Sequence, residues 1–212
     1  IGPTGLFVEP FGSLGFEEAV AAYKEQVRGL IDGGCDLIVI ETMIDIQETR
    51  AALLAVKETK DIFTIVSMTY EKDGHTLNGT DPVSALITLQ SLGADAVGCN
   101  CSTGPEKMLE FISLMKPYTT VPLIAKPNAG MPRLEDGKTV FDMDADDFGS
   151  WGMKLVQAGA NMIGGCCGTT PLHIETLAKT VAGKNPQPPV RKSLGALSSS
   201  RGYLIFAENN PL

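Results

Sequence analysis

Apolar residues follow two different spacings along this chain. Runs such as "CDLIVIET" at residues 35–42 are short and rich in β-branched side chains, which is typical of buried strands. Residues 16–34 instead repeat apolar side chains every three or four positions, which indicates an amphipathic helix that ends at two glycines. The strand-then-helix unit then recurs. We expect further helices at residues 46–57, 82–92, 105–115, 146–158 and 171–181, and further strands at residues 62–70, 95–100, 121–128 and 161–166.

Alternating strands and helices predict a parallel sheet within the α/β class, either a doubly wound open sheet or a (β/α)8 TIM-type barrel. The positions of polar and sulfur-bearing side chains favour the barrel. They fall at the carboxyl ends of the expected strands, at Glu41, Asn100, Cys101, Asn128, Cys166 and Cys167. In a barrel these ends converge on one mouth, where active sites lie, whereas an open sheet spreads them along an edge.

The expected strands are too few to close such a barrel. About five full strands and a short stub at residues 1–3 stand against the eight that the fold requires. We therefore expect residues 1–182 to form a partial, N-terminally truncated barrel, roughly strands 3–8, whose open edges favour self-association. Residues 183–212 are rich in proline, serine, glycine and basic residues. We interpret them as a linker and the start of a following module, with a possible strand at 203–206.

Composition excludes some classes of partner. The 212-residue chain is 43% hydrophobic and 20% charged, as in ordinary globular proteins. Its formal net charge of -8 argues against a nucleic-acid partner, which would favour a basic surface. No apolar run is long enough to span a membrane and no secretory signal opens the sequence, so we expect no membrane partner and a cytoplasmic location. The odd count of five cysteines suits reduced thiols better than a disulfide framework.

The stretch with the most specific chemistry is "GGCCGTTP" at residues 164–171. Adjacent cysteines rarely pair with each other, and on a regular strand they would point to opposite faces. The flanking glycines permit a turn on which Cys166 and Cys167 could act together. With Cys101 at the end of another strand, three thiolates at a barrel mouth would form a soft metal site. Zn²⁺ is the expected ion, and its fourth position would stay open to a substrate.

The remaining cysteines and histidines are weaker candidates for this site. Cys99 shares a strand face with Cys101 but lies one layer deeper, so we expect it to pack in the core. Cys35 begins its strand at the far rim and is also expected to pack. We expect His75, in a loop, and His173, in a helix, to be exposed to solvent. The alternative for the whole set is that all five cysteines are buried small hydrophobic residues.

Several motifs together resemble a known family. "GCNCS" and "GGCCGTTP", supported by "IGPTG", "ETMIDIQETRAAL", "NGTDP", "NCSTGPE" and "KPNAGMP", resemble zinc-dependent homocysteine S-methyltransferases, most closely the homocysteine-binding module of cobalamin-dependent methionine synthase. The resemblance implies a (β/α)8 barrel over most of residues 1–182. The implied zinc ligands are Cys101, Cys166 and Cys167. It also implies that Glu41 holds the amino group of homocysteine and that Asn128 faces the metal at the substrate site.

The resemblance implies transfer of a methyl group to the homocysteine thiolate, giving methionine. Three cysteine thiolates would keep a zinc-bound sulfur electron-rich, so no general base is needed. Methylcobalamin on another module is the favoured donor, and this chain alone is not expected to bind it. The expected partners are then homocysteine and the folate- and cobalamin-binding modules of the same protein. The alternatives are a single-module enzyme that uses a sulfonium or betaine donor, and a non-catalytic, self-associating fragment.

The chain departs from the family pattern in one respect. The family barrel opens with a glycine-rich "DGxxGT"-type segment whose backbone amides help to hold the substrate carboxylate, and no such segment occurs in this sequence. We therefore expect this chain by itself to bind homocysteine weakly, even with zinc present.

Overall fold

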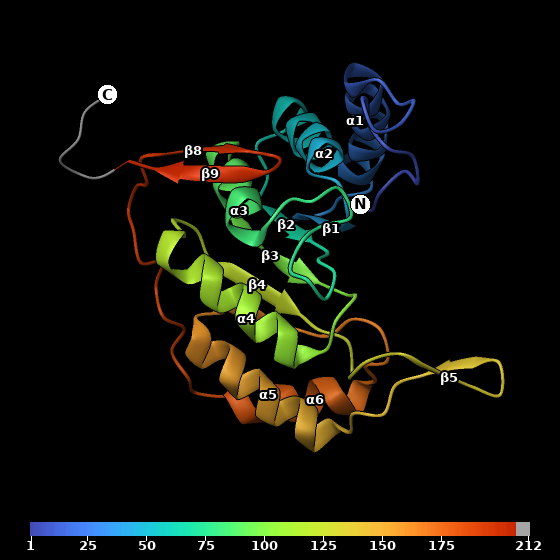
Figure 1. The fold of residues 1–212 in the computed structure, drawn as a ribbon, viewed down its shortest axis with the longest axis vertical. Coiled ribbons are helices and arrows are strands. Elements are labelled where there is room, and N and C mark those ends of the chain that lie inside the picture. Colours follow the sequence, from blue (N-terminus) through green and yellow to red (C-terminus); the bar gives the residue numbers. More distant parts are fainter. Residues whose placement is uncertain (207–212) are drawn as a thin grey trace.

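A computed structural model describes residues 1–206 of the chain. Its centre is a sheet of five parallel strands in the order β1-β2-β3-β4-β7 (Figure 1). The strands are β1 (Ile38–Met43), β2 (Thr64–Met68), β3 (Ala96–Asn100), β4 (Leu123–Lys126) and β7 (Met162–Ile163). The predicted α/β class and the parallel pairing of the strands are confirmed.

Six α-helices lie within residues 1–206. They are α1 (Phe16–Asp32), α2 (Ile46–Thr59), α3 (Pro82–Ser91), α4 (Pro105–Met115), α5 (Ala145–Ala158) and α6 (Pro171–Val181), and a short 3₁₀ helix, η1 (Lys116–Tyr118), follows α4. Side-chain caps define where several of them begin. The Asp45 carboxylate accepts a hydrogen bond from the Gln47 N–H at 2.9 Å, and the Asp81 carboxylate accepts one from the Val83 N–H at 2.9 Å. These caps confirm the starts of α2 and α3 that the sequence predicts.

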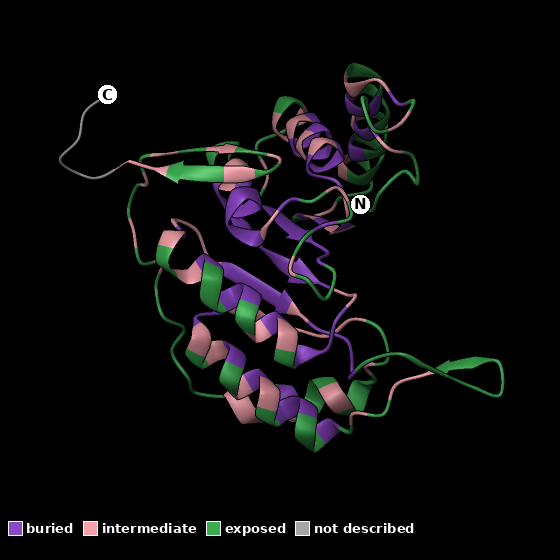
Figure 2. Ribbon diagram, in the orientation of Figure 1, coloured by how far each residue is buried: buried purple, intermediate pink, exposed green. Residues whose placement is uncertain are grey.

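The helices decide between the two architectures that the sequence allows. Each helix packs against the next one along the chain, from α1 to α6, so they form one continuous layer beside the sheet. A doubly wound sheet would instead divide its helices between both faces. Figure 2 shows buried residues concentrated along the strands and on the helix sides that face them. The arrangement is consistent with part of a TIM-type barrel, while closure of the barrel stays a prediction.

The sheet face away from the helices carries its own small apolar cluster. This cluster contains Val39, Ile65, Ala96, Ile124 and Met162. Because side chains alternate along a strand, and the intervening strand residues belong to the core shared with the helices, these five residues define an inner face. The inner face also carries polar side chains. Each lies two residues after an apolar residue of this cluster on the same strand: Glu41 after Val39, Ser67 after Ile65 and Lys126 after Ile124. The apolar cluster is therefore a floor, and polar side chains lie above it towards the carboxyl ends of the strands.

The chain begins beside the edge strand β1. The amino group of Ile1 donates a hydrogen bond to the Val39 carbonyl at 2.9 Å, and the Glu41 N–H donates one to the Ile1 carbonyl at 2.9 Å. These two bonds have the pattern of a parallel ladder centred on Ile40. The stub expected at residues 1–3 therefore extends the sheet beyond β1.

The strand expected at residues 161–166 is wrong in its extent, because β7 covers only Met162–Ile163. Two glycines follow, yet the chain stays beside β4. The Gly164 N–H donates to the Ala125 carbonyl at 3.1 Å, and the Cys166 N–H donates to the Pro127 carbonyl at 2.9 Å. The two adjacent cysteines thus lie on an irregular segment that is still hydrogen-bonded to its neighbour.

Two antiparallel hairpins add to the predicted elements. The long loop before α5 contains β5 (Arg133–Glu135) and β6 (Lys138–Val140), which project from the body of the protein (Figure 1). The expected strand at 203–206 corresponds to β9 (Gly202–Ile205), which pairs with β8 (Ala196–Ser199). Within residues 1–206, every helix is too short or too polar to cross a lipid bilayer.

The β8–β9 hairpin packs against helix α3. The hydroxyl groups of Thr88 and Ser198 lie 2.8 Å apart, and the Thr80 hydroxyl donates to the Ser200 carbonyl at 2.8 Å. The hairpin lies in the part of the chain that we expect to be a linker and the start of another module. The described portion of that segment is therefore attached to the domain that contains the parallel sheet, and whether a further module follows stays a prediction.

A buried carboxylate fixes the N-terminal segment to the helices. Glu48 on α2 is 1% exposed, and its Oε1 accepts hydrogen bonds from the Thr4 N–H at 2.7 Å and the Thr4 hydroxyl at 2.6 Å. The buried Tyr23 hydroxyl on α1 donates to the same oxygen at 2.9 Å. Burial, and then the charge of Glu48, raise the pKa of Tyr23, so the phenol remains a hydrogen-bond donor.

We expect Glu48→Leu to lower the free energy of unfolding by about 1–3 kcal/mol, because it leaves the buried Tyr23 hydroxyl and the Thr4 donors without their acceptor. Urea denaturation of the metal-free chain measures the change. Glu25→Leu, at an exposed position of α1, is the matched control and should have little effect. Equal loss of stability in both variants would contradict the role given to Glu48.

Candidate metal centre

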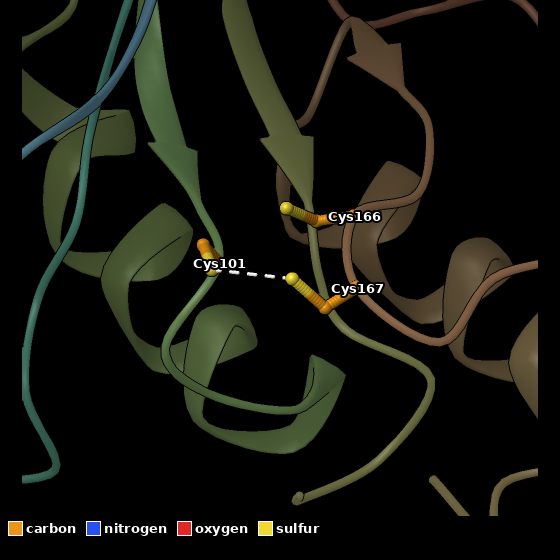
Figure 3. Close-up of side chains that lie close together, drawn as sticks. All are labelled: Cys101, Cys166 and Cys167. Carbon is orange, nitrogen blue, oxygen red and sulfur yellow. Dashed lines mark hydrogen bonds between the residues drawn. The ribbon is translucent and has the colours of Figure 1, made fainter. Parts of the chain in front are cut away.

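Three cysteine side chains from separate parts of the sequence meet at the carboxyl end of the sheet. Cys101 follows β3, while Cys166 and Cys167 follow β7, and the three thiols point toward one another (Figure 3). Their sulfur atoms all lie within 4.8 Å of one another, and the Sγ atoms of Cys101 and Cys167 are 3.7 Å apart. The group could hold a metal ion.

The backbone turns sharply where β3 ends. Cys101 has φ of 62° and Ser102 has φ of 57°, a left-handed conformation that residues other than glycine rarely adopt. The Cys101 N–H donates to the Lys126 carbonyl at 3.2 Å, so the turn remains attached to β4. Such strain is characteristic of functional sites, because the surrounding structure must maintain it. Here the turn directs the Cys101 thiol toward the other two cysteines.

The glycines around the paired cysteines have steric roles. Gly168 has φ of 79°, and a Cβ at this position would lie 2.3 Å from the Phe141 ring. The Thr169 hydroxyl donates to the Cys166 carbonyl at 2.7 Å, which closes the turn. On a regular strand the two adjacent cysteines would point to opposite faces, and this turn removes that constraint. Cys166 and Cys167 can both face Cys101 because the backbone between Gly165 and Gly168 is not extended.

Asn100 connects the cysteine cluster to the interior of the sheet. Its Oδ1 accepts hydrogen bonds from the Thr42 N–H at 2.9 Å and from the Ser67 hydroxyl, while its Nδ2 donates to the Thr42 hydroxyl at 2.8 Å. The same Nδ2 lies 3.7 Å from the Cys166 sulfur as a donor. Thr42 sits in an irregularity of β1 with φ of 60°. Asn100, which is 1% exposed, thus holds two strands and one cysteine in position.

Asn128 supports the third cysteine through the backbone. Its side-chain Oδ1 accepts a hydrogen bond from the Cys167 N–H at 3.1 Å, and Asn128 is 2% exposed. The Ala129 N–H donates to the Cys167 carbonyl at 2.9 Å. The segment after β4 therefore holds Cys167 through both its backbone N–H and its backbone carbonyl, next to the thiol cluster.

Glu41 and Lys126 form an ion pair on the inner face. The Lys126 ammonium contacts the Glu41 carboxylate, although the two residues belong to β1 and β4, with two strands between them. The Lys126 side chain is 18% exposed and that of Glu41 is 45% exposed. The charge of Glu41 therefore has a partner within the chain, and the Glu41 side chain remains partly exposed to solvent.

Hydrogen bonds within the cluster shift the pKa values of two of its thiols in opposite directions. The hydrogen bond with the Cys101 thiol is the main cause that lowers the pKa of Cys166, to about 5, and the Asn100 amide lowers it further, against the opposing effect of burial. The same hydrogen bond, followed by burial, raises the pKa of Cys101. The metal-free cluster thus favours a thiolate at Cys166, with Cys101 as its hydrogen-bond donor.

The other candidates from the sequence lie outside the cluster. Cys99 is 1% exposed and packs in the core, where burial raises its pKa, and Cys35 is half-buried against the same core. His75 lies in the exposed loop before α3. His173 is half-buried rather than exposed. Its Nδ1 accepts from the Thr170 N–H at 3.2 Å at the start of α6, and its Nε2 lies 3.0 Å from the Met143 carbonyl.

Two polar residues of the site have no role assigned from the sequence. Asn100 stands between the cysteines of "GCNCS", and Lys126 lies in the apolar run "VPLIAKPN". A polar or charged side chain near the carboxyl end of a strand expected to be buried is the signal that indicates both residues.

The fold and the thiol cluster define a potential metal site on a TIM-type α/β domain. Comparison with known families identifies the class. The model of the homocysteine S-methyltransferase family matches residues 1–181. The chain belongs to this family.

Similar proteins agree with this assignment. The chain is 34% identical over 167 residues to methionine synthase of Mycobacterium leprae (strain TN), and the match covers 76% of the chain and 14% of that protein. The apo form of the homocysteine methyltransferase MmuM from Escherichia coli matches with a TM-score of 0.69 and 25% identity, over 85% of this chain and 60% of that one. Its metallated form matches with a TM-score of 0.62 and 25% identity, over 76% and 51% of the two chains.

We expect Asn100→Ala to lower the free energy of unfolding of the metal-free chain by about 1–3 kcal/mol, because the Thr42 N–H and the Ser67 hydroxyl lose their acceptor. Ser67→Ala is the matched comparison. It removes one hydrogen bond and leaves the acceptor satisfied by Thr42, so its cost should stay below about 1.5 kcal/mol. Urea denaturation of both variants gives the comparison. A wild-type stability for Asn100→Ala would show that this network does not hold the strands.

Proposed function

We propose that this chain binds homocysteine through a zinc ion held by Cys101, Cys166 and Cys167, and that it presents the thiol for methylation to methionine. The observation that carries the proposal is the convergence of these three thiols at the carboxyl end of the sheet, in a chain of the homocysteine S-methyltransferase family. The metallated form of MmuM supports a metal in this fold. Zinc as the ion, and the role of each ligand, are parts of the proposal.

The donor set fits Zn²⁺ in chemistry and in spacing. Thiolates at Zn–S distances of about 2.3 Å in a tetrahedral arrangement lie about 3.8 Å from one another. The Sγ atoms of Cys101 and Cys167 are already 3.7 Å apart. Three protein ligands leave one position for a substrate. Bound zinc would supply the positive charge that keeps a coordinated thiol deprotonated at neutral pH.

Residues around the cysteines hold two of the three proposed ligands in position. The Asn100 amide donates to the Cys166 sulfur and so orients it, while Asn128 fixes the peptide of Cys167. Hydrogen bonds of this kind orient ligands and tune their basicity in metal sites. In the proposed site Asn128 also lines the substrate position beside the metal.

Glu41 is the proposed acceptor for the ammonium group of homocysteine. Its carboxylate lies on the inner face, above the apolar floor, and the Glu41 side chain is partly exposed to solvent. It already accepts an alkylammonium group, that of Lys126, which supports its fitness for this role. An ion pair with the substrate would orient the amino acid relative to the thiol cluster.

The proposed methyl donor is methylcobalamin, carried by another module of a methionine synthase-type protein. The chain spans 14% of the length of the M. leprae methionine synthase, which leaves ample room for folate- and cobalamin-binding modules in a protein of that kind. We place this reaction in the cytoplasm, where free thiols stay reduced.

The alternative is a single-module enzyme that uses a sulfonium or betaine donor. The match to MmuM favours it, because a homocysteine methyltransferase with the same fold need not be a methionine synthase. Self-association at the open sheet edges, without catalysis, is a further alternative for the isolated chain. The thiol cluster has the same proposed metal role in the first alternative, so the tests below concern binding of zinc and homocysteine, which both enzymes would share.

We expect one zinc ion per wild-type chain. Cys101→Ser should lose it, because a serine hydroxyl replaces a thiolate ligand. Cys99→Ser is the matched control, two residues earlier on β3, and should keep it. Metal analysis after dialysis against a weak chelator measures both. Retention by Cys101→Ser together with loss by Cys99→Ser would refute the ligand assignment.

We expect Glu41→Gln to weaken homocysteine binding by roughly tenfold or more, because a charged hydrogen-bond acceptor is lost. Its zinc content should stay at one per chain. Calorimetric titration of the zinc-loaded chain with homocysteine measures the affinity. The control is Glu175→Gln, which breaks an exposed Lys–Glu pair on α6 away from the site. Unchanged affinity in Glu41→Gln would remove Glu41 from the substrate site.

A further inference from the structure

Lys126 is the charged residue of the site that the proposed function leaves unused. It is the last residue of β4, and its carbonyl accepts a hydrogen bond from the N–H of Cys101 at 3.2 Å. Its side chain passes over Gly164, where an added Cβ would lie 3.4 Å from the Lys126 Cγ. Gly164 stands two residues before Cys166. Lys126 therefore lies between the two chain segments that carry the cysteines.

The ammonium group of Lys126 reaches across the inner face to Glu41. This side chain is only 18% exposed, whereas that of Glu41 is 45% exposed. A ligand entering from the mouth can therefore reach the carboxylate and compete with Lys126 for it. The two opposite charges stand above the apolar floor of Val39, Ile65 and Ile124, where an unpaired charge is costly.

We propose that Lys126 binds the α-carboxylate of the substrate, after the substrate ammonium replaces the Lys126 ammonium on Glu41. This inference rests on the proposed function, in which Glu41 takes the substrate ammonium. If Lys126 stayed on Glu41, neither residue of the pair would be free to match a charged end of a bound amino acid. After the exchange, Glu41 pairs with the ammonium and Lys126 pairs with the carboxylate, so all four charges are matched.

The exchange defines a substrate class. The site selects thiols that carry both charges of a free α-amino acid, and it discriminates against thiols that lack either one. A thiol with a carboxylate but no ammonium would find Lys126 still held by Glu41. A thiol with an ammonium but no carboxylate would displace Lys126 and leave it unpaired. Lys126 is thus a specificity-determining residue, distinct from the metal ligands.

Three ligands separate these contributions in calorimetric titrations of the zinc-loaded chain. They are L-homocysteine, 4-mercaptobutanoate, which lacks the ammonium, and 3-amino-1-propanethiol, which lacks the carboxylate. Lys126→Met should weaken binding of L-homocysteine roughly tenfold to hundredfold, because a charge-assisted hydrogen bond to its carboxylate is lost. Binding of 4-mercaptobutanoate should be weak in the wild type and should change much less, because Glu41 still holds Lys126 when the ligand has no ammonium. The same substitution should leave binding of the aminothiol unchanged or make it tighter, because the Lys126 ammonium no longer competes for Glu41. Lys126→Arg should restore most of the affinity for L-homocysteine.

Lys179→Met, which removes the exposed lysine of the pair on α6, is the matched control and should not change any of the three affinities. Equal weakening of all three ligands in Lys126→Met would mean that Lys126 only supports the structure. Tighter binding of L-homocysteine would mean that it only competes for Glu41. Either result overturns this inference and leaves the proposed function standing. If the zinc-loaded wild-type chain binds none of the three thiols even at the high ligand concentrations that weak binding requires, the proposed function and the inference both fail.

Discussion

Curvature of the parallel sheet is the constraint on which the site depends. Three strand spacings separate β1 from β4, which in a flat sheet would place their backbones about 14 Å apart. The Glu41–Lys126 ion pair nevertheless spans that distance, and Asn100 on β3 contacts Thr42 on β1. Side chains on one face of neighbouring strands can converge in this way only if the face is concave. The continuous layer of helices on the other side is the complementary, convex arrangement.

Much of this fold follows from local sequence patterns. The two apolar periods locate the helices and strands, and Asp45 and Asp81 mark helix starts because an aspartate at this position pairs with free N–H groups. The convergence of Cys101, Cys166 and Cys167 is also predictable, since the carboxyl ends of parallel strands share one side of the sheet. These features depend on short stretches of chain or on a general rule of topology.

Other features depend on contacts that no local pattern reveals. The partners of Asn100 and Lys126 come from strands distant in sequence, so their roles require the curvature of the sheet. The β5–β6 hairpin lies in a polar segment whose strands are three residues each, too short for periodicity to indicate. The strand at 161–166 shortens because two glycines replace side chains that would favour an extended ladder. Barrel closure stays a prediction, because the strand pairs described within residues 1–206 do not include a contact between the two edges of the sheet.

The polar residues of the site are also part of its mechanical support. Asn100 joins β1, β2 and Cys166 through one side chain, and Asn128 joins the end of β4 to Cys167. Removing such a group leaves several buried donors or acceptors unpaired at once. Stability and ligand geometry are therefore coupled here. A substitution chosen to alter the chemistry should be checked for its effect on folding.

The connection between α6 and the β8–β9 hairpin is hydrogen-bonded to the body of the protein near its middle. The Lys116 ammonium donates to the Pro188 carbonyl at 3.0 Å, the Asn161 amide donates to the Gln187 carbonyl, and the Arg191 N–H donates to the Thr119 carbonyl at 3.3 Å. A tether acts over the length that is free to move, and the effective concentration that it imposes depends on that length and its stiffness. Because residues 187–191 and the β8–β9 hairpin are hydrogen-bonded to the rest of the domain, they add little to that length. Any domain joined after this point would therefore be tethered at a fixed position beside α3, and only the chain beyond the hairpin would set how far it can move.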